Sequence, residues 1–142
     1  MITIDDVKLL SFPEFGDDRG RLAVVEGGAD KNIPFDIKRI FYIYGTKPET
    51  VRGGHVNIYS EFFFINICGK SKIKVADQGL NERIFVLDKP NVGLYLPRMI
   101  WKEMYGFSPD SILLVISSEY YDKNEYINDL HTFKNYREGL LK

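Results

Sequence analysis

The sequence predicts an all-β protein, a sandwich or closed barrel of the jelly-roll type, with short helices only near the C-terminus. Short apolar segments recur roughly every ten residues, with turn residues between them. His55 and Asn57 stand two apart, and residues with this spacing in a strand project from the same face. Such a polar pair, on a strand that leads into an apolar segment, favours a jelly roll with a ligand inside. The length of 142 residues fits one domain, residues 1–142.

The first half of the chain alternates apolar segments with turns. Along residues 37–44, Arg39 and Ile43 fall on one face of the predicted strand and Tyr42 on the other. Residues 13–21 are rich in glycine and aspartate and predict a turn. The predicted strands of this half are 7–12, 22–26, 37–44 and 61–68, and the polar pair lies on the strand that leads into the last of them.

The second half continues the pattern and then changes near its end. An aliphatic segment within residues 111–117 is too short for a typical helix and predicts a buried strand. From about residue 123 to residue 136, apolar residues are spaced as on one helical face, which predicts one or two short helices that cover the sheet. The predicted strands of this half are 70–76, 82–87, 93–97, 100–105 and 111–117, with a hairpin turn at 77–79.

Composition and charge exclude several classes of protein. A net charge of −1 and a pI of about 6.1 provide no basic field for nucleic acid. We find neither a signal-peptide pattern nor an apolar stretch of membrane-spanning length, so we expect a cytoplasmic protein without a membrane partner. Cys68 is the single cysteine, which excludes an intramolecular disulfide, and its apolar neighbours predict a buried thiol.

Ordered motifs along most of the chain point to one family. The segment from Arg52 to Glu61 resembles the first cupin motif, with Asn57 in the place of its second histidine. Together with other segments, it resembles the cupin-type nucleotide-sugar 3,4-ketoisomerases. The resemblance implies a cupin jelly roll, a homodimer with exchanged N-terminal strands, and a site without metal or cofactor. The other matching segments are 17–22, 32–39, 87–90, 93–95, 101–104, 107–108, 120–122 and 125–127.

The resemblance also implies a reaction. Its substrate would be a dTDP-linked 4-keto-6-deoxysugar such as dTDP-4-keto-6-deoxyglucose, whose keto group moves from C4 to C3 through an enediol. The product would serve deoxysugar biosynthesis for surface polysaccharide, such as lipopolysaccharide O-antigen, or for glycoconjugates. The family usually has histidines at the positions of Asn57 and Lys102, so His55 is the one imidazole of the three that this chain keeps.

The reaction needs a group that exchanges protons near neutral pH and a donor for the enediolate oxygen. His55 suits the proton transfers, whereas the amide of Asn57 forms hydrogen bonds but does not titrate. Lys102 would act as a base if burial lowered its pKa, and otherwise as a fixed cation. Tyr42 would supply a phenol as an acid. The candidate catalytic residues are therefore His55, Lys102, Tyr42 and Asn57.

Candidate substrate-binding residues complete the predicted site. Arg52, beside two glycines, is the best placed of the arginines for a phosphate, because guanidinium pairs with phosphate in a bidentate manner. Glu61 holds a metal-ligand position of other cupins, but no metal site is expected where Asn57 replaces an imidazole. A non-catalytic cupin that binds nucleotide sugars, and an epimerase acting on a related keto sugar, remain as alternatives. The full set of binding candidates is Arg52, Arg19, Arg39, Glu103 and Trp101.

Overall fold

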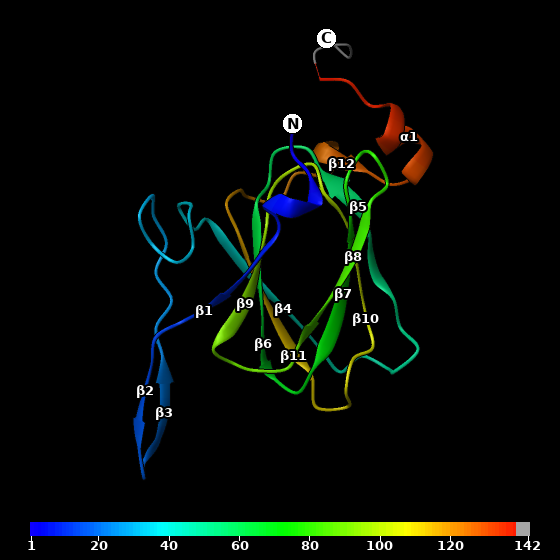
Figure 1. The fold of residues 1–142 in the computed structure, drawn as a ribbon. Helices are drawn as coiled ribbons and strands as arrows, with labels where there is room; N and C mark the ends of the chain where they lie inside the picture. The colour runs from blue at the N-terminus through cyan, green and yellow to red at the C-terminus, as the bar shows by residue number, and fades with distance from the viewer. Residues whose placement is uncertain (139–142) are drawn as a thin grey trace.

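A computed structural model describes residues 1–138 and shows two five-stranded antiparallel sheets that face one another (Figure 1). The first sheet has the order β1 (Lys8–Ser11), β9 (Val92–Leu96), β6 (Phe62–Cys68), β11 (Ile112–Ser117), β4 (Arg39–Tyr44). The second has the order β12 (Tyr126–Ile127), β5 (Arg52–Asn57), β10 (Trp101–Tyr105), β7 (Ser71–Ala76), β8 (Glu82–Leu87). The remaining elements are η1 (Ile4–Asp6), the hairpin β2 (Glu14–Asp17) and β3 (Gly20–Ala23), η2 (Lys123–Glu125) and α1 (Leu130–Asn135).

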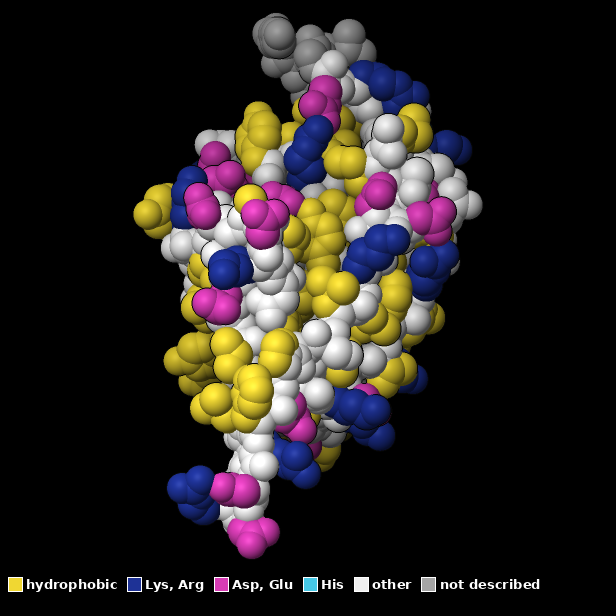
Figure 2. All heavy atoms as spheres, turned by 60° about the vertical axis from the view of Figure 1, so that its left-hand side comes forward, with side chains coloured by type: hydrophobic (Ala, Val, Ile, Leu, Met, Phe, Trp, Pro, Cys, Tyr) yellow, Lys and Arg dark blue, Asp and Glu magenta, His cyan; other side chains and the backbone are white. Residues whose placement is uncertain are grey.

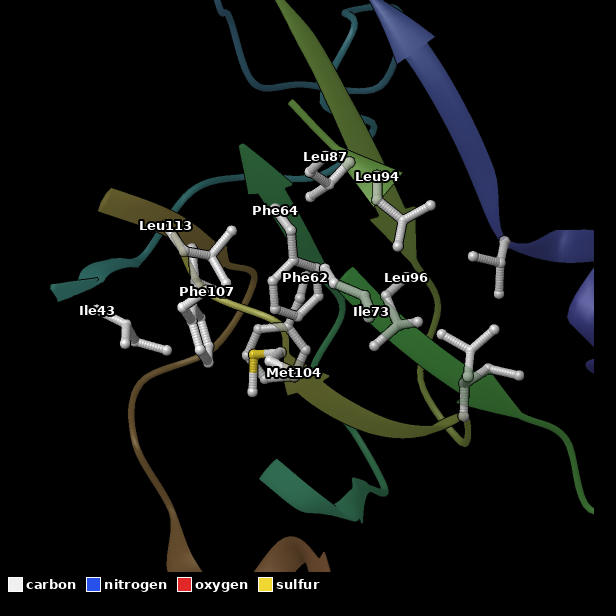
Figure 3. Close-up of a cluster of buried hydrophobic side chains, with 14 residues drawn as sticks. Ile43, Phe62, Phe64, Ile73, Leu87, Leu94, Leu96, Met104, Phe107 and Leu113 are labelled. Carbon is white, nitrogen blue, oxygen red and sulfur yellow. The ribbon is translucent and has the colours of Figure 1, made fainter. Parts of the chain in front are cut away.

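The chain passes back and forth between the sheets. From β4 to β11 every connection except the β7–β8 hairpin crosses from one sheet to the other, as a jelly roll requires. The inward-facing side chains of both sheets meet in the main apolar core, where Phe62, Phe64 and Met104 point toward one another (Figure 3). The predicted all-β jelly-roll class, with helix only in short segments, is confirmed. The two sheets do not close into a continuous barrel.

Two smaller apolar clusters cover the outer faces. Phe63 and Ile65 alternate with the core residues of β6 and pack outside the first sheet against Ile33 and Phe35. Outside the second sheet, the fully buried Phe133 of α1 packs in a cluster with residues of β5 and β10. Asp129 is the N-cap of α1, and its carboxylate accepts a hydrogen bond from the Thr132 backbone N–H. This packing places the C-terminal segment beside β5.

Strands β4 and β6 to β11 lie within two residues of their predicted ranges, and β5 holds the predicted polar pair. Three expectations were wrong. Residues 13–21 do not form a simple turn, because most of them belong to the β2–β3 hairpin. Cys68 is exposed, since the end of β6 emerges from the core. Residues 126–127 form strand β12 along the edge of β5, and Ile127 is buried in the apolar cluster with Val56 and Phe133.

The β2–β3 hairpin stands away from the sheets as an arm (Figures 1 and 2). Every residue of both strands is exposed, including the apolar Phe15 at 58% and Leu22 at 61%. Charged side chains gather toward its tip in Figure 2, where Arg19 forms an ion pair with Asp17. Among residues 1–138, no helix has the length and apolar character needed to cross a membrane.

Candidate active site

A bulge at the start of β5 sets the entrance to the site. Lys102 pairs with His55, but the next residue, Glu103, pairs with Gly53, so Gly54 is an extra residue in β5. Both glycines have positive φ, 85° at Gly53 and 75° at Gly54, and a Cβ on Gly53 would lie 2.8 Å from the Lys102 carbonyl oxygen. The bulge places Arg52 opposite the core residue Met104. Arg52 therefore shares the inner face with His55.

Lys102 and Asn57 form a buried polar pair between the sheets. The Lys102 Nζ donates a hydrogen bond of 2.6 Å to the Asn57 Oδ1, and the two residues are only 3% and 2% exposed. The same Nζ lies 4.7 Å from the centre of the Phe62 ring. Within residues 1–138, the Asn57 Nδ2 has no hydrogen-bond partner. A buried amide that lacks an acceptor is available to a ligand oxygen.

His55 lies beside this pair as a neutral imidazole. Its ring stacks on Tyr126 at a centroid distance of 4.3 Å and an interplanar angle of 21°. Burial, and next the positive charge of Lys102, lower the pKa of His55 to about 4. At pH 7 the ring therefore carries one N–H donor and one acceptor nitrogen.

The Lys102 amine titrates near neutral pH. Complete burial lowers its pKa from 10.5 to about 7; the charge of Glu125 acts against this shift and that of Arg39 reinforces it. The His55 ring releases its proton well before the amine does as the pH rises. At pH 7 the pair thus holds a neutral imidazole beside an amine that is able to accept or release a proton.

Arg39 brings a second cation to the inner face. Its guanidinium lies 5.2 Å from the centre of the Phe41 ring and 5.7 Å from that of Tyr121. The Nη2 donates a hydrogen bond of 3.4 Å to the Ser117 hydroxyl, while the buried Nε has no partner within residues 1–138. Arg39 alternates inward with the core residue Ile43, as the sequence pattern predicted.

Glu125 is a buried carboxylate next to the site. It is 1% exposed, and its Oε1 accepts hydrogen bonds from the backbone N–H groups of Tyr59, at 2.9 Å, and Ser60, at 2.8 Å. Its Oε2 accepts a third, of 2.6 Å, from the Ser60 hydroxyl. The Glu125 carbonyl also accepts from the Ile58 N–H, which fixes the start of β12 and so the ring of Tyr126.

The structure thus brings four of the predicted residues to one interior region, namely Arg39, His55, Asn57 and Lys102, whereas Arg52 at the start of β5 is exposed. The hollow lined by Tyr59, Tyr121 and Glu125 lies at the same end of the sheets and has a volume of about 580 Å³. Sequence reasoning missed Glu125 and Tyr126 as site residues. Both lie in the matched segment 125–127, but the apolar spacing that begins at Tyr126 predicts a helix there.

Four predicted site residues lie elsewhere in this chain. Tyr42 is 60% exposed and stacks on Tyr44 outside the first sheet, because it alternates with Arg39 and Ile43, which point inward. Its role as an acid stays a prediction, and within this chain its phenol lies outside the sheet that Arg39 faces from within. The other three are Arg19, on the projecting arm, and Trp101 and Glu103, which point outward from β10.

The outward pair on β10 supports the scaffold. The Trp101 indole donates a hydrogen bond of 2.9 Å to the Glu103 carboxylate and packs in the cluster with α1. Glu61, the metal-ligand position of other cupins, instead accepts a hydrogen bond from the Tyr95 hydroxyl. Within residues 1–138, no three His, Cys, Asp or Glu side chains gather as a metal-ion site.

Comparison with known proteins gives consistent matches. The family model described as "FdtA: WxcM-like, C-terminal" matches residues 5–138. A TDP-4-oxo-6-deoxy-alpha-D-glucose-3,4-oxoisomerase of Aneurinibacillus thermoaerophilus is 39% identical over 129 residues, which cover 91% of each chain. The crystal structure of a 3,4-ketoisomerase from Helicobacter canadensis is 40% identical, with a TM-score of 0.85 over 91% of this chain and 95% of that one.

A third relative was crystallised with a ligand. It is a histidine-to-asparagine variant of the 3,4-ketoisomerase QdtA from Thermoanaerobacterium thermosaccharolyticum, in complex with TDP-4-keto-6-deoxyglucose. It is 35% identical, with a TM-score of 0.86 over 92% of each chain. A dTDP-4-dehydrorhamnose 3,5-epimerase of Bacillus anthracis shares the cupin fold alone, at 18% identity and a TM-score of 0.75, over 90% of this chain and 81% of that one. The chain therefore belongs to the FdtA (WxcM-like, C-terminal) family of cupin-fold proteins.

Proposed function

We propose that this protein is a dTDP-sugar 3,4-ketoisomerase, which moves the keto group of a dTDP-linked 4-keto-6-deoxysugar from C4 to C3. The observation that carries the proposal is the buried Lys102–Asn57–His55 group, in which the amine titrates near pH 7 and an amide donor is free. Relatives at 39% and 40% identity have this activity in their names. The proposed substrate is the ligand found in the QdtA complex.

The proposed chemistry consists of proton transfers alone. The neutral amine of Lys102 removes the C3 proton, and the C4 oxygen gains a proton, which gives a 3,4-enediol. The C3 hydroxyl then loses its proton while C4 receives one, so the carbonyl stands at C3 and no atom is gained or lost. The neutral imidazole of His55 donates at one nitrogen and accepts at the other, which suits proton transfer between the two oxygens. The free Asn57 amide donates to the enediolate oxygen.

The cations of the inner face suit the nucleotide diphosphate. Arg39 and Arg52 offer guanidinium groups on that face, and such groups form charge-assisted hydrogen bonds with phosphate oxygens. Because the reaction is redox-neutral and requires only proton transfer, we propose that it uses neither cofactor nor metal. We place it in the cytoplasm, in deoxysugar synthesis for surface polysaccharide such as O-antigen or for glycoconjugates.

We further propose that the enzyme is a homodimer that exchanges its arms. The β2–β3 arm exposes Phe15 and Leu22, which in water is unfavourable for a lone hairpin. Strand β4 forms one edge of the first sheet, with no neighbour beyond it within residues 1–138. Its outer face adjoins an apolar hollow of about 410 Å³ that includes Tyr42 and Leu114. Pairing of the arm with β4 of a second copy would cover both surfaces and carry Arg19 into the partner.

Deuterium incorporation tests the activity. Purified protein is incubated with dTDP-4-keto-6-deoxyglucose in deuterated buffer and followed by proton NMR, with His55→Asn and, as the control, Glu82→Gln in the surface ion pair with Lys74. We expect the 3-keto product with deuterium at C4, a loss of at least about a hundredfold in His55→Asn, and normal rates in Glu82→Gln. An unchanged substrate after hours, with intact dTDP binding in calorimetry, would refute the enzyme and favour a binding cupin.

A second candidate activity follows from the same pocket. The replacement of two usual imidazoles by Asn57 and Lys102 alters the proton-transfer groups, and epimerisation of a related keto sugar also begins with proton removal beside a ketone. The carbon that gains deuterium distinguishes the two reactions. An epimer with unchanged carbonyl position, labelled at the inverted carbon, would replace the isomerase proposal.

A further inference from the structure

The buried Glu125 carboxylate, at the end of η2, is held by several hydrogen bonds. Two backbone N–H groups and the Ser60 hydroxyl donate to it, and the residue is 1% exposed. The three donors, directed at its two oxygens, hold this carboxylate in one position inside the protein. The next residue, Tyr126, pairs with Asn57 in the strand register and stacks on His55. Glu125 is therefore the chain neighbour of the residue that contacts His55 and pairs with Asn57.

The charges around Lys102 are few and can be assigned to elements. Arg39 faces it from β4, His55 from β5 and Glu125 from the end of η2, with the phenols of Tyr121 and Tyr126 beside them. Within residues 1–138, Lys102 forms no ion pair, and its hydrogen-bond acceptor is the neutral amide of Asn57. Glu125 is thus the buried anion that opposes both burial and the nearby guanidinium.

We propose that Glu125 is a positioning residue for the isomerase reaction, a fixed internal counter-charge that keeps the buried Lys102 amine able to hold a proton at neutral pH. Its catalytic meaning rests on the proposed function, because a base must also carry the proton that it removes before it returns it. Without the anion, the amine would be neutral across the working range and unable to deliver a proton. The positive charge of Arg39, no longer opposed by Glu125, would further disfavour the protonated amine.

The test measures the Lys102 amine directly by NMR titration of protein with ¹³C-labelled lysine, assigned with Lys102→Met. Glu125→Gln keeps an acceptor oxygen for the two backbone donors and removes the charge. We expect the midpoint of the Lys102 titration to move down by about one pH unit, because a nearby opposite charge is removed. Arg39→Gln should move it up, and the matched control Glu82→Gln, which removes an exposed carboxylate from the ion pair with Lys74, should leave it in place.

Two results separate this inference from the proposed function. If Glu125→Gln folds, as judged by its thermal transition, and the Lys102 midpoint does not move, Glu125 is only a structural anchor and the inference is overturned. If the midpoint moves as expected but the wild-type protein turns over no keto sugar, the counter-charge stands and the isomerase proposal fails. If Glu125→Gln does not fold, Glu125→Asp takes its place, with a smaller downward shift expected and an unchanged midpoint counting as refutation.

Discussion

Replacement of Lys102 by methionine should stabilise the protein at pH 7 while it abolishes activity. The Lys102 pKa is about 7 in the folded protein and ordinarily 10.5. Because the folded-state pKa is the lower one, the unfolded chain binds more protons between these pH values, and the free energy of unfolding rises with pH across that window. Below pH 7 the Lys102 amine is protonated in both the folded and the unfolded chain, so the full cost of burying the charge is present. Above pH 10.5 the amine is neutral in both, and this cost is absent.

The magnitude follows from the same two values. At about 1.4 kcal/mol per pH unit, the burial cost is about 4 kcal/mol at pH 7 and about 1 kcal/mol at pH 10. Lys102→Met removes this cost and leaves the Asn57 Oδ1 without its donor, which costs about 1–3 kcal/mol. The variant should therefore be more stable than wild type by about 1–3 kcal/mol at pH 7. The advantage should vanish or reverse at pH 10.

Urea unfolding of both proteins at pH 7, 8, 9 and 10 measures this difference, with the slopes compared to confirm one unfolding transition. Other titrating groups contribute equally to both proteins, so the difference isolates Lys102. Lys74→Met is the matched control, because its amine lies at the surface in an ion pair and its removal should leave no such pH dependence. A Lys102→Met protein that is less stable at pH 7, or a difference that does not change with pH, would refute the buried-amine argument.

The other predictions concern activity, assembly and packing. The kcat/KM should rise with pH through about 7, since the neutral form of Lys102 is the base, and a flat pH–rate profile from pH 5 to 9 would contradict this role. Tyr42→Phe should keep the isomerisation rate within about threefold, because the phenol lies outside the first sheet, and a hundredfold loss would show that it reaches a site. Phe15→Glu on the arm should shift sedimentation from dimer to monomer, whereas an unchanged dimer would locate the interface elsewhere. Phe133→Ala should lower the free energy of unfolding by about 3–5 kcal/mol in urea titrations, and a loss below about 1 kcal/mol would mean that α1 adds little to the fold.

Sequence patterns anticipated a large part of the fold and some of the site. Alternation along residues 37–44 predicts that Arg39 and Tyr42 lie on opposite faces of one strand, and β4 has these faces. The alternation does not say which face is interior, and only the structure places Tyr42 on the outer one. Trp101 and Glu103 also point outward, because motif membership names a residue and not the direction of its side chain.

The bulge and the C-terminal segment lay beyond pattern analysis. Gly53 and Gly54 indicated a special backbone, but only the pairing of β5 with β10 shows that Gly54 is the extra residue that brings Arg52 to the inner face. Tyr126 and Ile127 fit a helical spacing, yet they pair with the edge of β5 as a strand. Local periodicity cannot reveal such an edge, because it is created by strands distant in sequence.

The sequence by itself determined the class of fold, most strands between β4 and β11, and the facing of His55 and Asn57, because side-chain direction along a strand depends on a local period of two. Tertiary structure alone decided the chemistry available to these residues. The 2.6 Å contact of Lys102 with Asn57, and the pKa of about 7 for its amine, arise only when the two sheets exclude water from a cation that three separate elements surround. The physical reason is that burial and electrostatic interaction depend on distances in space, which adjacent residues in a chain do not encode.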